Sequence, residues 1–171
     1  MKTAKTIGIH LAVATVLVLT SDLARGQSSL TAEPQHSASK PAAVQYLYPE
    51  QLTIPAGKLT TVTLHFRIMP GLHINSHTPH EVELIPTILS IPEGFGVRLD
   101  GAIYPPGAEF VLPLDPKTQL NVYTGEFSIQ ARIVATPGDH LVEARLRYQA
   151  CDNSACMPPK TITVAIDVIG K

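Results

Sequence analysis

The chain has 171 residues, of which 13 are basic and 14 acidic, so its formal net charge is −1. This balance provides no basic surface for nucleic acid and no polybasic patch for a membrane, which leaves proteins and small molecules as the expected partners. We find no nucleotide-binding loop, no paired-carboxylate signature and no nucleophile elbow. The sequence therefore predicts no cofactor.

Residues 1–26 have the pattern of a cleaved secretory signal peptide. A basic start is followed by a mostly apolar stretch at 7–20, and the small residues Ala24 and Gly26 precede the expected cleavage point. A membrane-spanning helix needs about 20 apolar residues, so a permanent anchor is the weaker interpretation. We expect a periplasmic protein without stable membrane insertion after cleavage, in a compartment where disulfides form and persist.

The next segment, residues 27–43, is rich in Ser, Ala and Pro and has no apolar periodicity, which predicts a flexible leader. Residues 44–171 are expected to form one domain. Four of its segments alternate apolar and polar residues with the period of a half-buried strand: 59–68, 126–134, 141–148 and 161–168.

Turn residues such as Pro70-Gly71 punctuate these segments, and no long helical stripe is present. This pattern predicts an all-β fold, an immunoglobulin-like antiparallel β-sandwich. Residues 92–124 form the least regular stretch and are expected to contain a functional loop.

The two cysteines, Cys151 and Cys156, lie between two predicted strands. Four intervening residues can fold back to bring the Cα atoms within disulfide range, and an exported chain favours such pairing. As a staple, a loop this short would stabilise the fold by only roughly 2 kcal/mol in the entropic model. Reversible exchange instead needs access for an attacking thiolate. Spacing alone leaves a structural staple and a redox centre equally open.

Residues 148–159, Tyr-Gln-Ala-Cys-Asp-Asn-Ser-Ala-Cys-Met-Pro-Pro, resemble the active-site hairpin of the N-terminal periplasmic domain of the thiol:disulfide interchange protein DsbD. Residues 71–79 and 84–87 are similar to segments of its bacterial relatives, and the resemblance covers nearly all of 44–169. It implies an immunoglobulin-like fold and protein-disulfide reductase activity. The implied partners are thioredoxin-like periplasmic proteins, including those of cytochrome c maturation, and a separate membrane electron transporter.

The resemblance also implies roles for individual residues. Cys156 would form the mixed disulfide with partners, and Cys151 would resolve it. A cap loop at residues 100–107 would cover the disulfide, with Tyr104 as its aromatic residue and Ile103 where the family has a second aromatic. An ordinary turn tyrosine is the other interpretation of Tyr104.

Two further hypotheses do not involve exchange. One is a non-catalytic immunoglobulin-like binding module whose cysteine pair is a structural turn disulfide. The other is a copper or zinc site built from His73, His77 and His80, since imidazole suits these metals. Pro79 interrupts this run, which favours a loop of solvated histidines over a metal site.

Overall fold

The computed structural model describes residues 42–47, 51–113 and 115–171. The expected signal peptide at 1–26 and the expected leader up to residue 41 lie outside the described residues. Ala43, which is described, is 6% exposed, and its carbonyl oxygen accepts a hydrogen bond of 2.9 Å from the Met69 N–H. Within the described ranges, no helix has the length and apolar character needed to span a bilayer.

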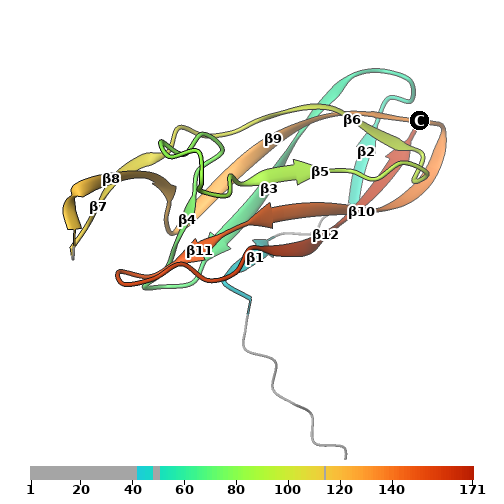
Figure 1. Ribbon diagram of the computed structural model, residues 1–171. Helices are drawn as coiled ribbons and strands as arrows, with labels where there is room; N and C mark the ends of the chain where they lie inside the picture. The colour runs from blue at the N-terminus through green and yellow to red at the C-terminus, as the bar shows by residue number, and fades with distance from the viewer. Residues whose placement is uncertain (1–41, 48–50, 114) are drawn as a thin grey trace, which may run out of the picture. The chain divides into compact units, whose positions relative to one another are not determined.

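The described part of the chain is built from strands in three sheets (Figure 1). The first sheet has the order β1 (Val44–Leu47), β3 (Thr60–Ile68), β9 (Glu126–Ala135) and β6 (Val97–Ile103). The second has the order β2 (Gln51–Ile54), β12 (Lys160–Gly170), β10 (Gly138–Tyr148) and β5 (Ile88–Ser90). The third has the order β11 (Ala150–Cys151), β4 (His73–Asn75), β8 (Asp115–Tyr123) and β7 (Ala108–Leu112).

Side chains from the first two sheets meet in one apolar core, so the all-β, immunoglobulin-like sandwich is confirmed. The four strands predicted from alternation are present as β3, β9, β10 and β12. Alternation works here because every second side chain of these strands points into the core. Phe66 of β3 is fully buried and its ring lies 5.2 Å from the ring of Phe127 on β9.

One strand pair of the sandwich is parallel, because β2 pairs with β12 in parallel from Asp167↔Gln51 to Gly170↔Ile54. A period-two pattern over four residues indicates the face of a strand but not its direction. The expectation that 92–124 is the least regular stretch was wrong, since it contains β6, β7 and β8. A register shift between Leu99 and Gly101 breaks the alternation in β6, and the β7–β8 hairpin is largely exposed, so neither leaves a clean pattern.

The third sheet lies at one end of the sandwich, where β10 ends and β11 begins (Figure 1). It joins β11 to β4 through the pairs Ala150↔Ile74 and Cys151↔His73. The cysteine loop is therefore attached to a sheet other than the one that supplies its two stems.

We expect Phe66→Ala to lower the free energy of unfolding by about 3–5 kcal/mol, because it leaves a cavity where two aromatic rings were packed. Chemical denaturation followed by circular dichroism measures this change. Val82→Ala is the control, since Val82 is 93% exposed and its truncation should change stability by less than about 0.5 kcal/mol. An equal effect of the two substitutions would contradict this view of the core.

Candidate functional site

Cys151 and Cys156 form a disulfide, with their Cα atoms 3.9 Å apart. The last pair of β10 and β12 is Tyr148↔Lys160, and the two cysteines then face each other in an antiparallel bridge. Cys151 follows β10 and Cys156 precedes β12, so the two cysteines lie opposite each other on the two arms of the loop.

The two cysteines differ in exposure. Cys151 belongs to β11 and is 1% exposed, whereas Cys156 lies on the returning arm of the loop and is exposed. Thiol–disulfide exchange requires a thiolate to reach one of the two sulfur atoms. The exposure therefore favours Cys156 as the residue that an incoming thiolate attacks.

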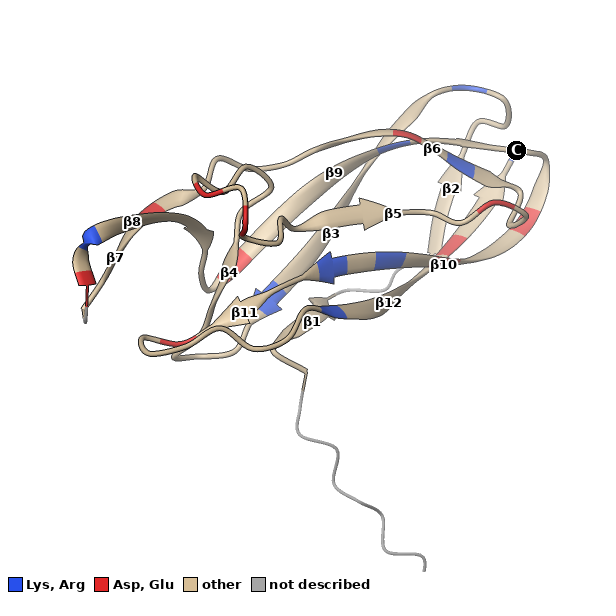
Figure 2. Cartoon of the chain, in the orientation of Figure 1, with Lys and Arg blue, Asp and Glu red and all other residues tan. Residues whose placement is uncertain are grey.

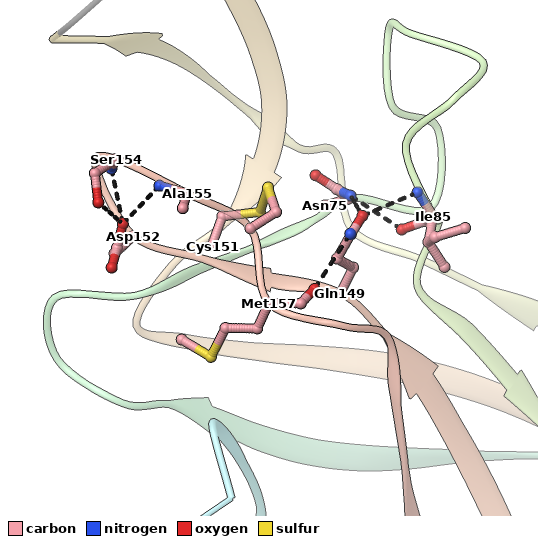
Figure 3. The surroundings of a disulfide bond; sticks show 9 residues. Asn75, Ile85, Gln149, Cys151, Asp152, Ser154, Ala155 and Met157 are labelled. Atoms are coloured by element: carbon pink, nitrogen blue, oxygen red, sulfur yellow. Dashed lines mark hydrogen bonds between the residues drawn. A yellow bond between two sulfur atoms is a disulfide. The ribbon is translucent and has the colours of Figure 1, made fainter.

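The tip of the loop is ordered by Asp152 (Figure 3). Its Oδ1 accepts hydrogen bonds from the Ser154 N–H at 2.7 Å, the Ser154 hydroxyl at 2.7 Å and the Ala155 N–H at 2.8 Å. These bonds, first of all those from Ser154, lower the pKa of Asp152 to about 2, and His73 contributes in the same direction. The loop between the cysteines therefore carries a fixed negative charge at neutral pH.

The base of the loop is held by Gln149 (Figure 3). Its Nε2 donates to the Met157 carbonyl at 3.3 Å, and its Oε1 accepts from the Asn75 Nδ2 at 3.2 Å. The Asn75 Nδ2 also donates to the Ile85 carbonyl at 3.1 Å. This network ties the exit of the loop to β4. No sequence pattern indicates the role of Asn75, and the Tyr-Gln-Ala-Cys string contains Gln149 without assigning it a role.

His73 lies directly opposite Cys151 in the β4–β11 pair. It is 2% exposed, and its ring centroid lies 4.4 Å from that of Phe110 on β7. Burial lowers the pKa of His73, and the charge of Asp152 partly opposes this shift. The interpretation of solvated histidines was wrong for His73, because β4 buries all three of its residues. A strand of three residues is too short to leave a periodic pattern.

The other two candidate metal ligands have different surroundings. The His77 ring stacks on the Tyr104 ring at 3.7 Å, and its Nδ1 lies 3.0 Å from the Thr87 carbonyl oxygen. The Nε2 of His80 lies 3.0 Å from Oε1 of Glu109. In the ranges that the structure describes, no group of three or more His, Cys, Asp or Glu residues is arranged to hold a metal ion.

The expected cap residues lie at the end of β6 and directly after it. Ile103 is the last residue of this strand and is 53% exposed. The hydroxyl of Tyr104 accepts a hydrogen bond of 2.8 Å from the Leu89 N–H, and burial raises the pKa of Tyr104. Its role as a lid stays a prediction. The aromatic residue that packs on His73, opposite Cys151, is Phe110, which no sequence pattern singled out.

A turn at residues 69–72 lines two cavities. In residues 69–72, the Leu72 N–H donates to the Met69 carbonyl at 3.1 Å, and Gly71 has a φ of 81°, which favours glycine. The first cavity, of about 570 Å³, is also lined by His73, Phe110 and Asn153, among others. The second, of about 270 Å³, is lined by residues that include Tyr148, Asp152 and Met157. Both cavities therefore adjoin residues of the disulfide loop.

No family model and no curated protein sequence matches the chain. Among solved structures, the chain is similar to the N-terminal domain of DsbD from Neisseria meningitidis in the reduced form. The similarity covers 63% of this chain and 77% of that chain, with a TM-score of 0.43 and 18% sequence identity.

The hydrogen bonds of Asp152 predict a dependence of stability on acid. The pKa of Asp152 is lowered from 3.8 to about 2 in the folded protein, so its carboxylate stabilises the fold above pH 3.8. That contribution is lost as the pH falls through about 2. We expect Asp152→Asn to flatten the decline in unfolding free energy over this interval, as measured by denaturant titrations of the oxidised protein.

Asp139→Asn serves as the control, because Asp139 lies at the far end of β10 from the loop. This variant should keep the wild-type decline. An unchanged acid dependence in Asp152→Asn would show that the ionisation of Asp152 does not contribute to the decline.

Proposed function

We propose that this chain is a periplasmic thiol–disulfide exchange protein that relays electrons between redox partner proteins through Cys151 and Cys156. The observation that carries the proposal is the disulfide itself, which joins a buried cysteine to an exposed one in a loop with ordered hydrogen bonds. In such a pair, the exposed sulfur can be attacked by a partner, and the buried sulfur can later resolve the mixed disulfide.

The chemistry requires two exchanges. A partner thiolate attacks Sγ of Cys156, the Cys151–Cys156 bond breaks, and Cys151 leaves as a thiolate that takes up a proton. A second thiolate of the same partner then attacks the partner's sulfur in the mixed disulfide. This frees Cys156 and leaves the partner with a disulfide. Run in reverse, the same steps let the dithiol form reduce the disulfide of another protein.

The proposed partners are thioredoxin-like periplasmic proteins and a separate membrane electron transporter. Support comes from the resemblance of residues 148–159 to the DsbD active-site hairpin. The open space around the loop would admit a partner, because both cavities reach residues of the loop. Arg145 and Arg147 are exposed in the half of β10 that leads into the loop, which is blue in Figure 2, and the loop itself carries the carboxylate of Asp152. A partner would therefore meet both signs of charge there.

A redox titration against glutathione tests the function directly. For a protein that exchanges disulfides, we expect the midpoint potential of the Cys151–Cys156 pair to lie above about −300 mV. A much lower midpoint would identify the bridge as a structural staple and leave the non-catalytic binding module as the better account of the chain.

Single-cysteine variants test the roles of the two sulfurs. We expect Cys151→Ser to form a mixed disulfide with glutathione disulfide that persists, because the exposed Cys156 can attack but no second thiol can resolve it. Cys156→Ser should react at least about ten-fold more slowly, since the remaining Cys151 is buried and glutathione disulfide has poor access to its sulfur. Mass spectrometry of the adducts gives both rates. Equal rates for the two variants would exclude the proposed division of roles.

A further inference from the structure

We propose that His73 is the proton acceptor for the thiol of Cys151 when that thiol closes the disulfide. The inference rests on the proposed function and adds a residue to it. In this role His73 and Cys151 act as a pair, in which the imidazole takes the proton and the sulfur becomes the attacking thiolate.

The first support is the register of the third sheet. His73 on β4 and Cys151 on β11 are directly opposed, and opposed residues of an antiparallel pair project to the same face with Cβ atoms about 4.5–5.5 Å apart. Both residues are buried. The pairing therefore places the imidazole and the sulfur side by side and away from bulk water.

The second support is an unpaired nitrogen. Among the described residues, Nε2 of His73 is a buried atom without a hydrogen-bond partner. Leaving a buried polar atom unpaired typically costs about 1–3 kcal/mol, so native structures rarely keep one without a reason. In the tautomer with its proton on Nδ1, this Nε2 is free to accept a proton.

The third support is the need for a base at Cys151. Burial raises the pKa of a thiol because it disfavours the thiolate, so a resolving cysteine at this position reacts slowly without an acceptor. Burial also keeps His73 neutral, since it lowers the pKa of the imidazole. A neutral imidazole is the form that can accept a proton.

The other charged groups near His73 do not fit this role. Asp152 has its pKa lowered to about 2 by the donors of the loop, which makes it a weak proton acceptor but a suitable counter-charge for an imidazolium. Arg67 and Glu126 line the same cavity as His73 and bind each other at 2.7 Å. Phe110 covers the ring of His73 with an apolar surface.

Proton transfer to His73 precedes the attack by Cys151. Cys156 is joined to a partner sulfur in the mixed disulfide, and the Cys151 thiol passes its proton to Nε2 of His73. The Cys151 thiolate attacks Sγ of Cys156, the Cys151–Cys156 bond forms, and the bond from Cys156 to the partner breaks. The partner sulfur leaves with the electron pair and is protonated by the imidazolium or by water.

The experiment uses the reduced protein and 5,5′-dithiobis(2-nitrobenzoate) in stopped flow. Attack by Cys156 releases one coloured thiolate, and resolution by Cys151 releases the second, so the two steps appear as two phases. We expect His73→Phe to slow the second phase at least about ten-fold near pH 7, because assistance by a general base is typically larger than this. The first phase should keep its wild-type rate.

The pH profile separates proton transfer from a structural effect. The wild-type second phase should stay near its plateau down to about pH 6.5, whereas that of His73→Phe should fall about ten-fold per pH unit below about pH 8.5, the ordinary thiol pKa. His80→Phe is the matched control, since His80 bonds to the exposed Glu109 and should keep both wild-type profiles.

His73→Gln provides a second, polar variant without a base and should show the same loss as His73→Phe. If the second phase of both variants runs parallel to that of the wild type at every pH, His73 is not the acceptor and the exchange function stands. If the wild-type protein releases no second thiolate, the exchange function itself fails, and the role of His73 fails with it.

Discussion

The site depends on a one-residue change of register at the end of the longest strand pair. Between Tyr148↔Lys160 and Cys151↔Cys156, the chain advances three residues on one arm and four on the other. The extra residue falls at Pro158-Pro159, where neither residue has an N–H to donate to a ladder. Had the register of β10 and β12 continued, Cys151 would face Met157 instead of Cys156. The shift is what allows the disulfide to form directly across the loop.

The same change of register releases the incoming arm from the second sheet. Beyond Tyr148 the chain pairs with β4. It contacts the other arm through the Met157 N–H, which donates to the Ala150 carbonyl, and through the Gln149 side chain, which donates to the Met157 carbonyl. Cys151 thereby enters the third sheet and becomes buried, while Cys156 stays on an arm with no sheet partner apart from the bridge to Cys151 among the described residues. A hairpin with uninterrupted pairing would present two cysteines in similar surroundings. The proposed order of exchange depends on this difference in exposure, which is a consequence of the backbone register.

The sequence could predict those parts whose physics is local and periodic. β3, β9, β10 and β12 were foreseen because each has one face in the core and one in water. The cysteine loop was foreseen from its place between two such strands. The surroundings of His73 could not be predicted, because Cys151, which pairs with it, is 78 residues away and β4 has only three residues. The contact of Phe110 with His73 could not be predicted for a related reason. The β7–β8 hairpin is largely exposed, so its sequence has no alternation of apolar and polar residues.

The energetics of the site are hard to reconcile with a purely structural role. Closing a loop this short stabilises the fold by roughly 2 kcal/mol in the entropic model. The unpaired Nε2 of His73 beside it costs about 1–3 kcal/mol, a similar magnitude with the opposite sign. An apolar side chain at position 73 would fill the same space against Phe110 without that cost. As a structural staple beside a buried unpaired imidazole, the disulfide would therefore add little net stability to the fold. In the proposed exchange, the buried thiol of Cys151 must lose a proton, and Nε2 of His73 can accept it.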